Sequence, residues 1–177
     1  NHAHLGAQIE STLGNGARFG ISISYSPEPD GALETAGGVI QALPLLGSHP
    51  FFLISGDIYV ECDYRSLVAP PLRDDATALM WMVDNPPWHA KGDFALRDGQ
   101  LVFDGEPKMT YANIGIFTPA FFAGIESGRR LPMLPLFKRG IDAAAIDAAR
   151  FTGMWDNLGN PEQLRKLDTL LRSRLSR

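Results

Sequence analysis

The sequence lacks the features that mark several large classes of protein. Cys62 is its one cysteine among 177 residues, so no disulfide can form within the chain, and no Cys/His spacing typical of a zinc site occurs. The 16 basic residues do not outnumber the 20 acidic ones, which indicates no surface for nucleic acid. No apolar run reaches the length of a membrane span, and no signal-peptide pattern opens the chain. We therefore expect neither nucleic acid nor a membrane as partner, and the single cysteine favours a reducing, cytoplasmic compartment.

Several catalytic signatures are also absent. The chain has no Gly-x-Ser-x-Gly nucleophile elbow and no Gly-x-Gly-x-x-Gly dinucleotide fingerprint. Its four histidines show no spacing for a metal site or a catalytic triad, and only His89, in a polar loop, is kept as a candidate substrate contact. Hydrolase chemistry has little support.

The apolar patterns predict an α/β fold. Strand-like and helix-like segments alternate, which favours a Rossmann-like, mostly parallel (mixed) sheet flanked by helices, and a hairpin adds an antiparallel element. The length and an ordinary composition (45% hydrophobic, 20% charged) fit one domain with a sizeable core. We expect helices over 5–13, 37–46, 63–68, 134–145 and 160–175, strands over 21–25, 51–55, 77–83 and 109–117, a 94–97/101–104 hairpin and an extended segment over 150–154.

The segment 51–57 carries the most specific signal. Phe51 to Ser55 reads as a strand buried on both faces, and ligands of open α/β sheets bind at the carboxyl ends of such strands. Asp57 is placed there as a candidate metal or ribose ligand, and Gly56 lets a ligand approach closely. The alternative is that Asp57 only caps the next turn.

A second candidate segment is Leu33 to Gly38, which follows a loop and opens a helix. Gly37 and Gly38 at a helix N-terminus leave backbone N–H groups for a base edge or a phosphate. The alternative is that both glycines allow tight packing of helix against sheet.

Further polar residues interrupt apolar segments. Gly92 and Asp93 follow a predicted strand, and Asn113 lies inside another, where its amide needs a hydrogen-bond partner such as a sugar hydroxyl or the backbone. Asp156 and Asn157 precede the last helix and either face the carboxyl edge of the sheet or belong to a turn.

Taken together, these segments resemble the sugar-1-phosphate nucleotidyltransferases, and within them the bacterial N-acetylmuramate-1-phosphate uridylyltransferase branch, which serves peptidoglycan recycling. The resemblance covers essentially the whole chain, and its specificity lies in the order and spacing of the motifs. These are Asn1 to Gly6, Tyr25 to Glu28, Leu33 to Gly38, Ser55 to Asp57, Val83 to Pro86, Gly92 to Phe94, Asn113 to Ile116 and Trp155 to Leu164.

The resemblance implies a transferase that uses Mg²⁺, a nucleoside triphosphate and a sugar 1-phosphate, and that releases a nucleotide sugar and pyrophosphate. UTP with N-acetylmuramate 1-phosphate is the first expectation, and GTP with mannose 1-phosphate is the second. The resemblance assigns Asp57 and Asn157 to the metal, with Asp57 also catalytic. It assigns the nucleotide to Glu34, Ala36, Gly37, Gly38 and Gly56, and the sugar to Gly92, Asp93 and Asn113.

The chain departs from the family pattern in two places. The family's N-terminal strand, Gly-rich loop with arginine, and Pro-Lys-Pro lysine are not in this sequence, so we expect residues 1–177 to form a single domain that lacks its N-terminal nucleotide-binding segment and is not competent alone. The family's second metal Asp is replaced by Asn157, whose uncharged oxygen is a weaker Mg²⁺ ligand. Either Asn157 coordinates weakly, or the adjacent Asp156 takes part, or the metal relies on Asp57 and phosphate. A non-catalytic binding or regulatory domain of the same fold is therefore the rival reading.

Overall fold

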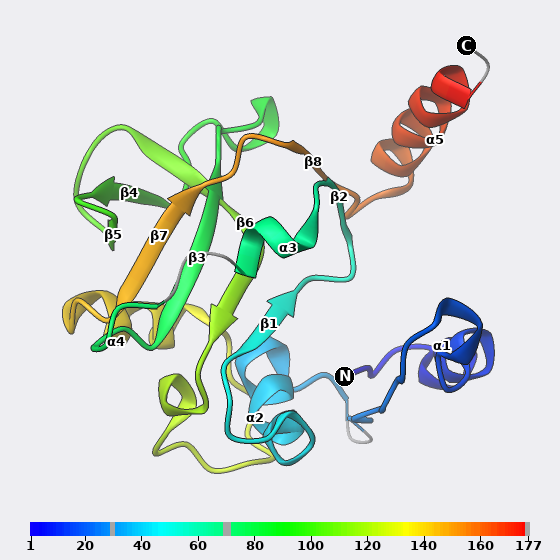
Figure 1. Ribbon diagram of the computed structural model, residues 1–177, viewed down its shortest axis with the longest axis horizontal. Helices are drawn as coiled ribbons and strands as arrows, with labels where there is room; N and C mark the ends of the chain where they lie inside the picture. The colour runs from blue at the N-terminus through cyan, green and yellow to red at the C-terminus, as the bar shows by residue number, and fades with distance from the viewer. Residues whose placement is uncertain (29–30, 69–71, 176–177) are drawn as a thin grey trace. The chain divides into compact units, whose positions relative to one another are not determined.

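The computed structural model describes residues 1–28, 31–68 and 72–175 (Figure 1). It contains α-helices, short 3₁₀ helices and strands in alternation, and the bounds of each are as follows. The α-helices are α1 (Gly6–Leu13), α2 (Glu34–Leu46), α3 (Tyr64–Val68), α4 (Leu134–Asp142) and α5 (Pro161–Leu175). The 3₁₀ helices are η1 (Ala17–Phe19), η2 (Pro87–His89) and η3 (Pro119–Phe122). The strands are β1 (Phe51–Ile54), β2 (Ile58–Glu61), β3 (Ala78–Val83), β4 (Phe94–Arg97), β5 (Gln100–Val102), β6 (Lys108–Phe117), β7 (Ile146–Arg150) and β8 (Met154–Asn157).

The chain divides into two compact units. Unit 1 comprises Asn1–Phe51 and Phe117–Ala143, and unit 2 comprises Phe52–Ile116 and Ala144–Arg177. The six-stranded sheet belongs to unit 2 except for the two end residues Phe51 and Phe117. Among the described residues, no helix combines the length and the apolar character that crossing a bilayer requires.

Strand β3 lies inside the sheet and forms the centre of the unit 2 core. The strand order is β1-β6-β3-β7-β5-β4, and all six residues of β3 are buried. Such a strand has no solvent face, which explains its continuous apolar sequence. The residues buried together around it are Leu67, Leu79, Trp81, Val83, Ala112, Ile114, Ile116 and Phe151.

The sheet is mixed, as predicted. β3 pairs with β7 in parallel, whereas β4 pairs antiparallel with both β5 and β6, and β5 pairs antiparallel with β7. Asp98 and Gly99 join β4 to β5, and both have positive φ (52° and 79°), as the tight turn of a two-residue hairpin requires. The predicted hairpin is therefore confirmed, and the chain has the α/β fold that the patterns indicated.

A second, two-stranded ribbon leads to the last helix. β2 and β8 pair antiparallel, with Ile58 opposite Asn157. Helix α5 then starts at Pro161, as predicted, because the side-chain oxygen of Asn160 accepts hydrogen bonds from the backbone N–H groups of Glu162 and Gln163, both at 3.0 Å.

Three predictions of local structure were wrong. Residues 21–25 form no strand: the N–H of Ile23 donates to the carbonyl of Asn15, so this backbone bonds to a neighbouring turn and to no strand. β1 is an edge strand and Ile54 is 39% exposed, so it is not buried on both faces. Helix α4 ends at Asp142, before the predicted end at 145, since Ala144 has a φ of 51°. Strand β7 (Ile146–Arg150) then begins in a stretch for which no strand was predicted, because the predicted extended segment started only at residue 150.

Candidate functional site

Asp57 lies where β1 gives way to the β2/β8 ribbon. Its backbone carbonyl accepts a hydrogen bond from the N–H of Leu158 at 2.6 Å, and Ile58 stands opposite Asn157 in the register. Asp57, directly before β2, and Asn157, the last residue of β8, therefore lie at the same end of the ribbon. The Asp57 side chain is exposed, as is Gly56, where an added Cβ would meet nothing within 4 Å.

The segment that carries Asn157 presents further oxygen atoms. The side-chain oxygen of Asn157 accepts the N–H of Gly159 at 2.8 Å, and a carboxylate oxygen of Asp156 accepts the N–H of Asn157 at 2.9 Å. Carboxylate and amide oxygens are the donors that Mg²⁺ prefers, so the residue types fit this ion. Over residues 1–28, 31–68 and 72–175 no group of three His, Cys, Asp or Glu could hold a metal, so phosphate or water oxygens would have to complete the coordination shell.

Asp93 fixes the loop that follows η2. One carboxylate oxygen pairs with Nε2 of His89 at 2.9 Å, and the other accepts the backbone N–H of Tyr111 at 2.8 Å. The N–H of Asp93 in turn donates to the carbonyl of Met109 at 2.8 Å. Asp93 therefore joins this loop to β6, and His89, the one histidine kept from the sequence, is its partner. Burial raises the pKa of Tyr111, so its phenol stays protonated at neutral pH.

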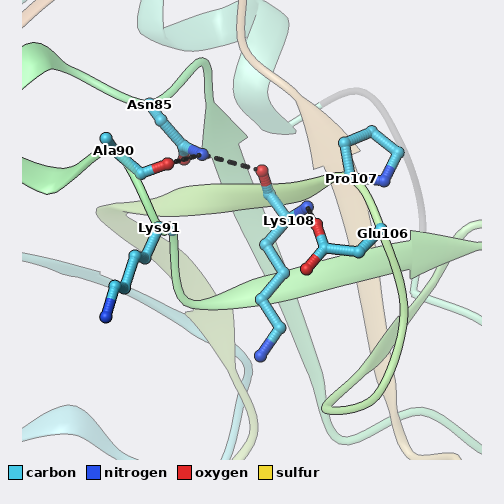
Figure 2. Close-up of a pocket in the computed structure, with 7 residues that line it drawn as sticks. Asn85, Ala90, Lys91, Glu106, Pro107 and Lys108 are labelled. Atoms are coloured by element: carbon cyan, nitrogen blue, oxygen red, sulfur yellow. Dashed lines mark hydrogen bonds between the residues drawn. The ribbon is translucent and has the colours of Figure 1, made fainter.

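Asn85 holds the same loop from its other side, and sequence reasoning assigned it no role. Its side-chain nitrogen donates to the carbonyls of Ala90 (3.2 Å) and Lys108 (2.9 Å), as Figure 2 shows. Its side-chain oxygen accepts the hydroxyl of the buried Thr110 at 2.9 Å. The signal available in the sequence was a polar amide two residues after the end of the fully buried strand β3.

An open pocket of about 560 Å³ lies beside Asn85 and contains Gly92. Gly92 has a φ of +62°, and an added Cβ would come within 2.7 Å of the Asn85 side chain and 3.0 Å of the Lys108 backbone. Only glycine fits this position without displacing one of them. The lining residues are Asn85, Ala90, Lys91, Gly92, Glu106, Pro107 and Lys108.

Asn113 lies farther along β6 and connects the sugar candidates to the metal candidates. Its φ is 56°, and its carbonyl accepts the N–H of Ser55, two residues before Asp57, at 3.1 Å. On the preceding residue, the carbonyl of Ala112 accepts the indole N–H of Trp155 at 2.8 Å. β6 therefore contacts both segments that lead to the predicted metal ligands, and the structure brings these residues together within unit 2.

The remaining nucleotide candidates, Glu34 and Ala36 to Gly38, belong to unit 1. Helix α2 starts at Glu34, three residues earlier than predicted, and Glu34 has a φ of 63° and pairs with Arg130 at 2.8 Å. Ala36 is fully buried. The expectation of an open N–H at Gly37 was wrong, because this group donates to the carbonyl of Leu131 at 3.1 Å.

Glu28 is a buried carboxylate in unit 1 that sequence reasoning did not select. It is 7% exposed and accepts hydrogen bonds from the Asn1 side chain and from the N–H of Leu33, each at 2.6 Å. A Cβ added at Gly38 would come within 2.6 Å of the Glu28 carboxylate, so Gly38 allows this close approach. Glu28 therefore positions the start of α2.

Two curated proteins are similar to the chain over most of its length. The N-acetylmuramate alpha-1-phosphate uridylyltransferase of Neisseria meningitidis serogroup B is 38% identical over 175 residues, covering 96% of this chain and 76% of the relative. The enzyme of the same name from Caulobacter vibrioides is 30% identical over 151 residues, covering 79% of this chain and 62% of the relative. A comparison with models of protein families finds no match.

Solved structures agree on the fold. A Bacillus anthracis protein assigned as a glucose-1-phosphate thymidylyltransferase, in complex with sucrose, superposes with a TM-score of 0.77 at 20% identity, covering 94% of this chain and 72% of that one. The inositol-1-phosphate CTP transferase of T. maritima gives 0.73 at 12% identity, covering 97% and 73%. The chain thus has the nucleotidyltransferase-like α/β fold.

The 38% identity to the Neisseria relative, over 96% of this chain, also shows the family. The chain belongs to the sugar-1-phosphate nucleotidyltransferases, in the family of these uridylyltransferase relatives.

Proposed function

We propose that this chain catalyses uridylyl transfer from UTP to N-acetylmuramate 1-phosphate. The observation that carries the proposal is the 38% identity, over 96% of the chain, to a protein named for that activity. The clustering of the sugar and metal candidates around β6 supports it, because the reaction needs both close to one point.

In the proposed reaction, an oxygen of the sugar phosphate attacks the α-phosphorus of UTP in line. A new P–O bond forms as the bond to the β-phosphate breaks, and pyrophosphate leaves with the electron pair of that bond. The chain contributes mainly by positioning, since no side chain needs to form a bond to substrate. Asp93 and Asn85 act at this level: their hydrogen bonds hold the loop from His89 to Gly92 against β6.

Asp57 and Asn157 would hold Mg²⁺ in this proposal. The ion supplies neutralisation of phosphate charge when it is bound. Asp57 offers an exposed carboxylate, whereas Asn157 offers an uncharged oxygen that already accepts one hydrogen bond. We therefore expect Asp57 to contribute more than Asn157 to the affinity for Mg²⁺.

The activity test measures pyrophosphate release by purified protein expressed from its complete gene. UTP with N-acetylmuramate 1-phosphate should be the most active pair in a panel that includes N-acetylglucosamine 1-phosphate, and GTP with mannose 1-phosphate. The Asp57→Asn variant should lose activity by about a hundredfold, the scale of a lost charged group in such a site. Release from no pair would overturn the enzymatic proposal in favour of a binding domain.

The metal assignment has a separate test. Asn157→Asp adds a charge beside Asp57 and should lower the Mg²⁺ concentration that gives half-maximal activity, because carboxylates bind this ion more strongly than amides. Asp156→Asn, on the preceding residue, is the matched control. It should leave the Mg²⁺ concentration for half-maximal activity within about twofold, since Asn retains the oxygen that accepts the Asn157 N–H. A shift with D156N and none with N157D would assign the metal to Asp156.

A further inference from the structure

The pocket beside Asn85 contains two lysines on separate segments. Lys91 comes from the loop after η2, and Lys108 is the first residue of β6. Figure 2 shows both side chains extending to the same side of the sheet ribbon. Glu106 is the one carboxylate among the described lining residues, and it accepts the backbone N–H of Lys108 at 3.2 Å. Neither lysine forms an ion pair with any residue that the structure describes, so both ammonium groups are available to a ligand.

The spacing of the two lysines is set by Asn85. The same side-chain nitrogen bonds the carbonyl of Lys108 and that of Ala90, the residue before Lys91. Gly92 packs closely against both residues, because a Cβ added at this position would clash with the Asn85 side chain and the Lys108 backbone. A pocket whose two lysine-bearing backbone segments are held together in this way presents two cations on separate elements, which matches a ligand with two separate anionic groups.

We infer that Lys91 and Lys108 make this pocket selective for a sugar 1-phosphate that carries a carboxylate, with Lys108 meeting the phosphate and Lys91 the carboxylate. The inference rests on the proposed function and names the residue that determines its substrate. N-acetylmuramate differs from N-acetylglucosamine by a lactyl ether, which adds one carboxylate to the sugar. The 1-phosphate of a sugar without a carboxylate would leave one of the two lysines without an anionic partner.

The assignment of each lysine follows from how firmly it is held. The phosphate reacts, so its partner must keep a fixed position, and Lys108 is a half-buried strand residue whose carbonyl Asn85 holds at 2.9 Å. Lys91 is exposed on a loop, where it can reach a substituent at the rim of the pocket. Lysine acts on either group as a point charge with rotatable donors.

The test compares Lys91→Met and Lys108→Met on N-acetylmuramate 1-phosphate and N-acetylglucosamine 1-phosphate, with UTP and protein from the complete gene. K91M should lower kcat/KM for the muramate substrate at least about tenfold, mainly through KM, and leave the glucosamine substrate within about twofold. K108M should lower both by about tenfold or more. Lys91→Arg should retain most of the preference, because the charge remains, and Lys166→Met, on exposed α5, is the control for an unrelated lysine.

Calorimetric titration of each sugar phosphate in the absence of UTP gives a second readout, and it covers the case in which the glucosamine substrate is not turned over. Equal losses for K91M on both substrates, no loss on either, or the reversed pattern between the two lysines would overturn the inference while the proposed function stands. A wild-type protein that turns over only sugar 1-phosphates without a carboxylate would overturn both the inference and the proposed substrate. A wild type that is inactive with every pair overturns the proposed function instead.

Discussion

At position 92, the backbone conformation and the neighbouring atoms impose two separate requirements. The φ of +62° disfavours any residue with a side chain, and the atoms of Asn85 and Lys108 occupy the place of a Cβ. The sequence showed a glycine before an aspartate, which is common in turns. The structure adds that this glycine is needed for Asn85 to reach two carbonyls at once.

The two requirements at Gly92 can be separated by mutation. Gly92→Ala should lower the free energy of unfolding by about 2–4 kcal/mol, from strain at positive φ and from displacement of Asn85. Gly99→Ala is the matched control in unit 2, since Gly99 has a φ of +79° but nothing within 4 Å of an added Cβ, and it should cost about 1 kcal/mol. Urea unfolding followed by circular dichroism measures both. Equal losses would show that sterics at Gly92 contribute nothing.

Cys62 gives a residue-level prediction that depends on pH. Burial and then the charge of Asp63 raise the pKa of its thiol, so the reactive thiolate is scarcer in the folded protein than in the unfolded one at pH 8. Iodoacetamide should alkylate it about three- to tenfold more slowly in the native protein than in urea. Asp63→Asn keeps the oxygen that caps α3 and should raise the native rate only slightly, because burial is the larger cause. A native rate equal to the unfolded rate would contradict the prediction.

Among the elements, the start of α5 and the β4–β5 turn are specified by local chemistry and were predicted, whereas the errors at residues 21–25 and in β1 concern neighbouring strands. The caps of α5 and the turn at Asp98 and Gly99 need only nearby residues, so the sequence patterns were sufficient. The strand expected at 21–25 had the right alternation but pairs with no strand in the part of the chain that the structure describes, and β1 has an apolar sequence although it lies at the sheet edge. Pairing partners are a tertiary property that a local pattern does not contain.

Trp155 links strand β8 to β6 through its indole N–H. Trp155→Phe removes the donor to the carbonyl of fully buried Ala112 and should lower the free energy of unfolding by about 1–3 kcal/mol. Trp88, whose ring lies 6.3 Å from that of Trp155 but is 53% exposed, provides the control. Trp88→Phe should change stability by less than about 0.5 kcal/mol in the same urea experiment, followed by circular dichroism. A W155F variant as stable as W88F would show that the hydrogen bond contributes nothing net.

For the whole molecule, all nucleotide candidates but one lie in a different unit from the sugar and metal candidates. Glu34 and Ala36 to Gly38 belong to unit 1, whereas the remaining nucleotide candidate Gly56, the metal candidates Asp57 and Asn157, and the sugar candidates belong to unit 2. The sequence motifs proposed these residues as candidates, and their roles stay predictions. Asn85 and Glu28 lie within two of the same motifs but were assigned no role, since their roles come from contacts with residues distant in the chain, such as Lys108 and Asn1.

This division predicts that mutations in the two units act on different substrates. Glu34→Ala in unit 1 should raise the KM for UTP about tenfold and leave the KM for the sugar phosphate within about twofold, because it removes a charged hydrogen-bond acceptor proposed to hold the base. Steady-state kinetics of pyrophosphate release, varying one substrate at a time, measure both constants.

The control separates Glu34 from its ion pair. Arg130→Met removes the partner of Glu34 but leaves the carboxylate in place, so the KM for UTP should stay within about twofold, as expected for an exposed pair. If R130M raises that KM as much as E34A does, the ion pair, and not the acceptor, prepares the nucleotide site. If E34A instead raises the KM for the sugar phosphate, the assignment of substrates to the two units is wrong, because Glu34 would then act on the ligand that Lys91 and Lys108 were expected to hold.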